Sequence, residues 1–122
     1  MSLKESGEMY LESIYVLCRS QKSVRSVDIA AHMDFSKPSV SRGVGILKKQ
    51  GYITVDKEGY ISLTASGKEA AERIFERHTL LTAVFKAIGV DEQTAEADAC
   101  RIEHVISEDT FKAIREFYSK MK

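Results

Sequence analysis

The chain has few of the features that mark secreted or strongly basic proteins. Its 122 residues include only two cysteines, Cys18 and Cys100, and 18 basic residues balance 18 acidic ones. Two widely separated cysteines do not form a disulfide framework, and a reducing compartment would keep them as thiols. Because the formal net charge is zero, any contact with nucleic acid must come from a local basic patch.

Long apolar runs are also absent. No run approaches the roughly 20 residues that a membrane-spanning helix needs, and the opening segment MSLKESGEMY lacks the apolar core of a signal peptide. We therefore expect no membrane association and a cytoplasmic location. The 43% hydrophobic content is sufficient to form a core, so the length indicates one ordinary domain or two small ones sharing a core.

The first half of the chain predicts three short helices. Apolar residues at helical spacing indicate a first helix from Gly7 to about Arg19. Ser26 is a favourable N-cap for a second helix. Ser36 is expected to cap a third, which has Pro38 in its first turn and ends before Gly51.

A β-hairpin is expected directly after the third helix. Residues 52–55 and 60–63 are rich in strand-forming residues, and a polar segment ending in Gly59 separates them. Such a hairpin is the wing of a winged helix-turn-helix. We therefore expect residues 1–64 to form a winged helix-turn-helix domain that binds DNA.

The second half reads as helix almost throughout. Thr64 is expected to cap a long helix from about Ala65 to Ile88, a fifth helix spans Asp91 to Ile106, and Ser107 caps a sixth. The predicted fold class is mainly α, with a helical domain over residues 65–122 following the winged helix-turn-helix.

The second and third predicted helices have the length and separation of a helix-turn-helix, with Asp34 and Phe35 in the turn. The start of the second of these helices meets base edges in that motif, and an arginine there such as Arg42 can bond guanine through two hydrogen bonds. Basic side chains nearby would hold phosphates. The candidate DNA contacts are Arg25, Ser36, Lys37, Pro38, Ser39, Ser41, Arg42, Lys48, Lys49 and Lys57. The alternative is an ordinary solvated helix face, which the adjoining hairpin disfavours.

A metal-binding pattern lies in the fifth predicted helix. Cys100, Glu103 and His104 stand at i, i+3 and i+4, which places them on one face of a helix. Thiolate, carboxylate and imidazole all bind divalent transition metals. Further donors on the first, long and fifth helices are Glu8, Met9, Glu12, His78 and Glu96. The alternative is a coincidence of a buried thiol with exposed polar neighbours.

Two other residues with donor atoms are interpreted without a metal. His32 lies near the end of a short helix, and we interpret it as a surface or capping imidazole. Cys18 shares the apolar face of the first helix with Leu11 and Ile14, and we interpret it as a small core residue.

Several motifs together resemble a known family. EMYLESIY, SKPSVSR, the LT-x-x-G junction, ERH, GVD and ACRIEHVIS, in this order over nearly the whole chain, are similar to metal-dependent repressors of the diphtheria-toxin-repressor type in a compact form without an SH3-like domain. The resemblance implies a homodimer that binds a double-stranded DNA operator with ferrous iron or manganese and represses metal-uptake genes. It also implies that the second half binds metal and dimerises. The implied main site comprises Met9, Cys100, Glu103 and His104, and a second site comprises His78, Glu12 and Glu96.

Two departures from the family pattern bear on the metal. Thr82 stands four residues after His78, where the iron-responsive branch usually has a glutamate, and Met9 and Cys100 stand where compact manganese regulators have acids. Sulfur donors favour softer ions than manganese. We therefore favour Fe(II) as the cofactor, with Mn(II), Co(II), Ni(II) or Zn(II) possible.

Other functions and roles stay open at this level. A small zinc metallohydrolase would use Cys100 and His104 as ligands and Glu103 as base, but it also needs a substrate pocket, for which the sequence offers no signal. A winged-helix regulator could instead sense oxidants through Cys100. We expect a regulator and not an enzyme. The dimer seam is expected on the long and fifth helices at Leu80, Val84, Phe85 and Ile88, although the same residues also fit an intramolecular core.

Overall fold

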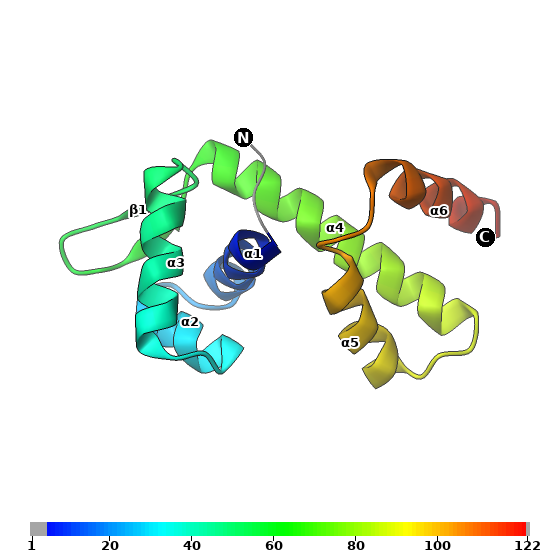
Figure 1. Cartoon of the computed structure of the whole chain (residues 1–122), viewed down its shortest axis with the longest axis horizontal. Helices are drawn as coiled ribbons and strands as arrows, with labels where there is room; N and C mark the ends of the chain where they lie inside the picture. Colours follow the sequence, from blue (N-terminus) through cyan, green and yellow to red (C-terminus); the bar gives the residue numbers. More distant parts are fainter. Residues whose placement is uncertain (1–4, 122) are drawn as a thin grey trace. The chain divides into compact units, whose positions relative to one another are not determined.

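The computed structural model describes residues 5–121, which are mainly helical, as expected (Figure 1). In chain order the elements are α1 Glu5–Ser20, α2 Ser26–Met33, α3 Lys37–Lys49, β1 Ile53–Val55, β2 Ile61–Leu63, α4 Ala65–Ala87, α5 Glu92–Ile102 and α6 Glu108–Met121. Within the described residues, no helix combines the length and the apolar character needed to cross a membrane.

The chain forms two compact units whose boundary falls inside α4. The first unit extends to Glu72 and the second begins at Arg73. The first therefore contains α1 to α3, the hairpin and the start of α4, and the second contains the rest of α4 with α5 and α6. The predicted domain boundary after residue 64 stays a prediction.

The first unit is built around the apolar faces of its three short helices. α1 and α2 each pack against α3 and against one another, while β1 contacts α3 and β2 contacts α1. On these three helices, the core side chains with no solvent exposure are Leu11, Ile14, Ile29, Val40 and Leu47. Tyr10 also belongs to this core, and its ring lies directly against Gly43, where an added Cβ would overlap it. Gly43 therefore allows α1 and α3 to approach closely.

The start of α3 follows the sequence prediction, whereas the start of α2 differs from it. Ser36 caps α3, because its side chain accepts a hydrogen bond from the Ser39 amide. The N-cap of α2 is Arg25 and not Ser26. The reason is that the Asp28 carboxylate accepts a hydrogen bond of 2.8 Å from the Arg25 amide and so begins the helix one residue earlier.

The hairpin is short and antiparallel, with Thr54 paired to Ser62 at its centre. Its turn needs Gly59, whose φ of 86° is a conformation that other residues rarely adopt. The Asp56 carboxylate accepts hydrogen bonds from the amides of Glu58 and Tyr60 within the same turn. The predicted wing is thus present directly after α3.

The second unit packs α4, α5 and α6 around a small apolar cluster. Leu81, Ala99 and Phe111 are buried, with Leu80, Phe85, Ile102, Ile106 and Ile114 partly buried against them. Leu80 and Phe85, expected at a dimer seam or in the core, therefore contribute to this unit's core, whereas Ile88 is 70% exposed.

The predicted fifth helix is too long at its C-terminal end. α5 ends at Ile102, Glu103 is its C-cap, and His104 to Ile106 form a turn and bend. Two contacts account for the early end. The Arg77 side chain donates hydrogen bonds to the backbone carbonyls of Glu103 and Ile106, and Ser107 caps α6 by accepting from the Thr110 amide. We call residues 103–106 the ligand turn.

Candidate metal centre and nucleic-acid interface

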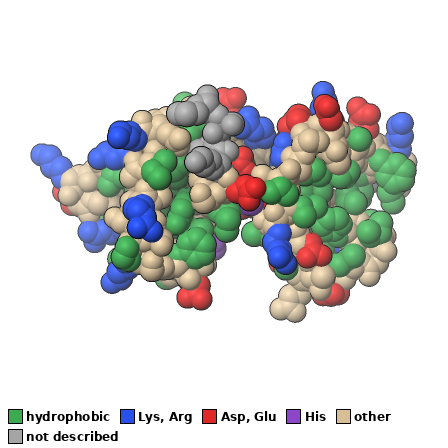
Figure 2. All heavy atoms as spheres, viewed as in Figure 1, with side chains coloured by type: hydrophobic (Ala, Val, Ile, Leu, Met, Phe, Trp, Pro, Cys, Tyr) green, Lys and Arg blue, Asp and Glu red, His purple; other side chains and the backbone are tan. Residues whose placement is uncertain are grey.

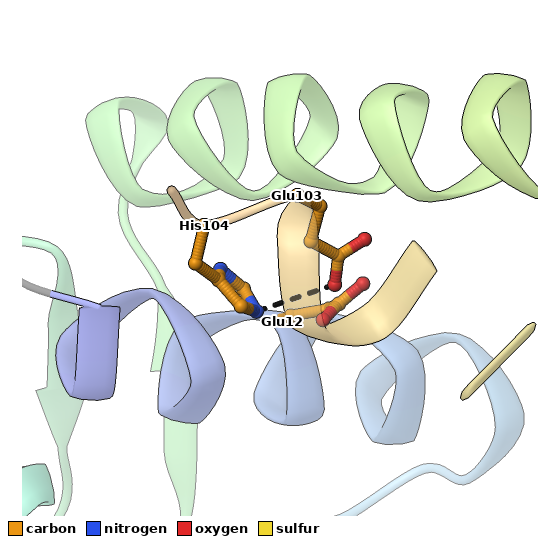
Figure 3. A group of neighbouring side chains, drawn as sticks. All are labelled: Glu12, Glu103 and His104. Atoms are coloured by element: carbon orange, nitrogen blue, oxygen red, sulfur yellow. Dashed lines mark ion pairs between the residues drawn. The ribbon is translucent and has the colours of Figure 1, made fainter. Parts of the chain in front are cut away.

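The Glu103 carboxylate lies between two imidazoles in the second unit. One carboxylate oxygen is 3.1 Å from Nδ1 of His78 on α4, and the other is 3.2 Å from Nε2 of His104. Figure 3 shows the pair of Glu103 and His104 at the end of α5. Glu103 has no solvent exposure, and the His104 side chain is only 3% exposed. These oxygen and nitrogen donors are chemically suited to a divalent transition metal.

Burial of the Glu103 carboxylate has an energetic cost that its neighbours must offset. A carboxylate removed from water is costly unless charged or hydrogen-bonding partners surround it. His78 and His104 supply such partners, and their nitrogens are also the atoms that a metal would use. The structure thus places the Glu103 carboxylate and the His104 imidazole where water has little access, with the partly exposed His78 beside them, a setting in which cation binding is strengthened.

The predicted donors of α1 belong to the first unit. Met9 and Glu12 stand one turn apart on α1, and both are half-buried. Glu12 is the third side chain drawn in Figure 3. Glu8, a further predicted donor on this helix, is also half-buried.

The expectation that Cys100, Glu103 and His104 share one helix face is corrected by the structure. Because α5 ends at Ile102, only Cys100 of the three lies within the helix, and it is exposed. Glu96, one turn earlier, is exposed as well. Thr82, at the position that departs from the family pattern, donates its hydroxyl to the His78 carbonyl at 2.8 Å.

Arg77 is a residue that the sequence reasoning did not assign to the site. It lies beside His78 in the ERH motif, yet its hydrogen bonds reach residues well along the chain in the ligand turn. The ERH motif was the only sequence signal that could have pointed to Arg77. Spacing along one helix does not reveal bonds to another segment, so the tertiary structure was needed to find it.

The candidate DNA-contacting residues form an accessible surface of the first unit. Apart from Ser39, which is half-buried, the predicted DNA contacts are exposed. The Tyr10 hydroxyl donates to the Ser39 carbonyl at 3.1 Å, which holds the start of α3 on the core. Figure 2 shows lysine and arginine side chains spread over this unit. α3 itself carries basic residues and no acidic one, so it supplies the local positive charge that a neutral chain needs.

Arg25 lies where the start of α2 meets the hairpin. Its guanidinium lies 5.3 Å from the centre of the Tyr60 ring, at the base of the hairpin turn. A cation over an aromatic face is held by electrostatic attraction. This contact orients Arg25 between the start of α2 and the wing.

The two remaining residues with donor atoms lie apart from the candidate centre. His32 is exposed on α2, in agreement with its interpretation as a surface imidazole. Cys18 is half-buried on α1, and burial raises the pKa of its thiol. A protonated, partly buried thiol fits the interpretation of Cys18 as a packing residue.

Two family models match the chain in succession. The model described as iron dependent repressor, N-terminal DNA binding domain, matches residues 2–61. The model described as iron dependent repressor, metal binding and dimerisation domain, matches residues 64–122. The resemblance inferred from the sequence motifs is therefore confirmed.

Similar proteins cover most of the chain. The regulator MntR of Lysinibacillus sphaericus is 32% identical over 96% of this chain and 84% of its own length. MntR of Shouchella clausii is 37% identical over 89% of this chain and 76% of its own length. An uncharacterised helix-turn-helix regulator of Methanocaldococcus jannaschii is 28% identical over 98% of both chains.

Solved structures of such regulators share the fold. The manganese regulator SloR superposes with a TM-score of 0.81 at 24% identity, over 98% of this chain and 55% of that chain. A manganese-dependent transcriptional repressor solved with manganese gives a TM-score of 0.80 at 26% identity, over 88% of this chain and 50% of that one. This chain thus spans about half the length of these two structures. From these matches, the chain belongs to the iron-dependent repressor family of metal-dependent, DNA-binding transcriptional regulators, which are not enzymes.

Proposed function

We propose that this protein represses transcription when a divalent transition metal, preferably Fe(II), binds to a centre that includes Glu103 and His104. The observation that carries the proposal is the buried Glu103 carboxylate between two imidazoles, within the segment matched by the metal-binding model. A bound ion would supply a concentrated positive charge that replaces the carboxylate–imidazole contacts with stronger coordination bonds.

The proposed ligands have two levels of support. Burial and distance support Glu103, His104 and His78. Donor chemistry and place in the motifs support the other residues. The proposed main site comprises Met9, Cys100, Glu103 and His104, and the proposed second site comprises His78, Glu12 and Glu96.

Ligands from both units would explain how metal affects DNA binding. Met9 and Glu12 belong to the first unit, whereas Glu103 and His104 belong to the second. Coordination by residues of both would restrict the motion of one unit against the other. In a homodimer, this restriction would fix the distance between two α3 helices near the roughly 34 Å that separates successive major-groove turns.

The DNA-contacting role is proposed for the exposed side chains around α3. Arg42 would read a base, and Ser36, Lys37, Pro38, Ser39 and Ser41 would line the approach to the groove. Arg25, Lys48, Lys49 and Lys57 would hold phosphates. The partner would be an operator in genes of metal uptake or homeostasis, and the protein would act in the cytoplasm.

The experiment that tests the proposal titrates the reduced protein with Fe(II), Mn(II) and Zn(II) while following binding to a fragment of its own promoter. We expect tight, specific binding only with metal, because a neutral chain has little electrostatic attraction for DNA. Equal binding by reduced, chelator-treated protein contradicts the proposal. A response to oxidant and not to metal would instead favour thiol sensing by Cys100.

Metal preference is tested by replacing sulfur with oxygen at two proposed ligands. The double change Met9→Asp with Cys100→Glu should shift activation toward Mn(II) and away from Fe(II) and Co(II), since carboxylates suit Mn(II) and sulfur suits softer ions. The measurement is the ratio of Mn(II) to Fe(II) concentrations that give half-maximal operator binding. The control removes the same kinds of sulfur elsewhere, with Met33→Leu and Cys18→Ser, and should leave the ratio unchanged. An unchanged ratio in the first variant places selectivity elsewhere.

A further inference from the structure

The side chain of Arg77 donates hydrogen bonds to three residues outside its own helix. One terminal nitrogen donates to the Glu103 carbonyl at 3.1 Å and to the Ile106 carbonyl at 3.0 Å. The other donates to the Glu108 carboxylate at 2.9 Å, and the Arg77 side chain is only 15% exposed. The guanidinium also lies 5.3 Å from the centre of the Phe111 ring.

These contacts hold the backbone on both sides of His104. The last carbonyls of a helix lack amide donors from the helix itself and need other partners. Arg77 supplies a donor to the carbonyl at the end of α5 and to another at the end of the ligand turn. Since Glu103 and His104 both belong to this turn, the guanidinium fixes the backbone that carries both side chains.

The same guanidinium connects the ligand turn to α6. Glu108 stands in the first turn of α6, and the hydrogen bond from Arg77 is the main cause that lowers the pKa of its carboxyl. Phe111, one turn further along α6, packs in the core of the second unit. Arg77 therefore donates hydrogen bonds both to the ligand turn and to the start of α6.

We propose that Arg77 is a positioning residue that holds Glu103 and His104 in the geometry required for metal binding and couples their turn to α6. The inference rests on the proposed metal site, to which it adds a residue that donates hydrogen bonds without itself touching the ion. Arginine suits this role because its planar fork directs several N–H groups at once, whereas lysine offers a single flexible ammonium.

Arg115 provides a matched control within the same unit. Its guanidinium lies 4.9 Å from the centre of the same Phe111 ring, on α6, and pairs with Glu76 at 2.8 Å. It thus shares with Arg77 the charge, the aromatic contact and an ion pair between α4 and α6. Two features distinguish Arg77 from this control: its bonds to the carbonyls of the ligand turn, and a side chain that is 15% exposed against 45% for Arg115.

The test compares Arg77→Gln, Arg77→Lys and Arg115→Gln with the unaltered chain. Co(II) serves as the probe, because its visible absorption reports coordination directly, and hydrogen exchange of the amides at residues 104–106 reports order in the turn. We expect Arg77→Gln to weaken Co(II) binding about 10- to 100-fold, as for other residues that orient metal ligands. Arg77→Lys should weaken Co(II) binding less than Arg77→Gln does. Arg115→Gln should change it by less than about 3-fold, because exposed ion pairs contribute little.

Exchange at residues 104–106 should accelerate in the metal-free Arg77 variants but not in Arg115→Gln. The inference is overturned if Arg77→Gln and Arg115→Gln weaken Co(II) binding equally, or if exchange in the turn is unaltered in both. Should Arg77→Gln fail to fold, Arg77→Lys decides by the same two measurements. A wild-type chain that does not bind Co(II) would overturn the proposed metal site itself, which is a different result from loss of the difference between variants.

Discussion

The two units of this molecule differ in the contacts that stabilise each of them internally. In the first unit, side chains such as Leu11, Ile29 and Leu47 have no solvent exposure and form an apolar core between three helices and a hairpin. In the second unit the buried apolar cluster is smaller, and the fully buried Glu103 with its two imidazoles lies in the same unit. The first unit therefore depends mainly on apolar burial, and the second depends also on charge.

Because of this difference, we expect the two units to respond differently to metal and to pH. An apolar core responds little to metal or to pH, so the surface around α3 should keep its shape in both states of the switch. Carboxylates and imidazoles respond to both. The second unit also leaves Phe117 and Ile88 largely exposed, which accords with the dimerisation role of the matching family model. The predictions below separate the two units on these grounds.

The largest effect is expected from His104→Ala, which removes a nearly buried proposed ligand. We expect loss of metal-dependent operator binding with a retained helical fold, since the apolar cluster of the second unit is untouched and His78 still pairs with Glu103. Operator binding across a metal titration, with circular dichroism, checks this prediction. The control is His32→Ala at an exposed imidazole of the first unit, which should respond to metal like wild type. A His104 variant that responds at wild-type metal concentrations would exclude this residue from the centre.

Gly43→Ala should destabilise the first unit by about 1–3 kcal/mol, because the added methyl group overlaps the Tyr10 ring. Gly45→Ala on the same helix meets no atom within 4 Å and should instead stabilise the protein by up to about 1 kcal/mol. Urea denaturation of the metal-free protein measures both. If the two alanines have the same effect, the close packing of α1 on α3 is not a determinant of stability.

Arg42→Ala should weaken specific operator binding by about 1–3 kcal/mol and relax the preference at one base position. Lys49→Ala should weaken binding to all sequences alike and reduce its salt dependence, as expected for a phosphate contact. The measurement is binding to operator variants and to unrelated DNA at several salt concentrations. Neither change should alter Co(II) affinity. Identical behaviour of the two variants would mean that the α3 surface meets DNA differently.

The smallest effect concerns Asp91, which caps α5 in the second unit. Its side-chain bond with Thr94 lowers the pKa of Asp91, so the cap stabilises the folded chain above the ordinary aspartate pKa of about 3.9 and is lost as pH falls through the lowered value. Asp91→Asn keeps an acceptor without a titrating group and should reduce this acid sensitivity. The measurement is the thermal unfolding of the unaltered chain and of Asp91→Asn at pH 7 and pH 3. Identical acid sensitivity would show that other groups govern it.

Local sequence signals predicted most of the fold. Ser36, Thr64 and Ser107 stand directly before α3, α4 and α6, and Gly51 and Gly59 adopt positive φ where turns were expected. These signals succeed because caps and turns depend on residues within a few positions of one another. The family resemblance also follows from the sequence, since motif order and spacing are properties of the chain alone.

The end of α5 is a feature that local sequence signals did not predict correctly. Helical spacing placed Cys100, Glu103 and His104 on one face, but the helix ends before Glu103. Arg77, on another helix, donates hydrogen bonds to the carbonyls of Glu103, the C-cap residue, and of Ile106. A propensity-based prediction does not include such a donor, so it extended the helix through the ligand turn.

The sequence by itself determined the order of the elements, the donor types available for a metal and the basic side chains around α3. Only the tertiary structure decided that Glu103 is buried between His78 and His104 and that Cys100 is exposed. It also decided that Arg77 bonds both ends of the ligand turn. The physical reason is that spacing along a helix fixes direction only within that helix. Burial and hydrogen bonds between distant residues depend on which segments pack against one another.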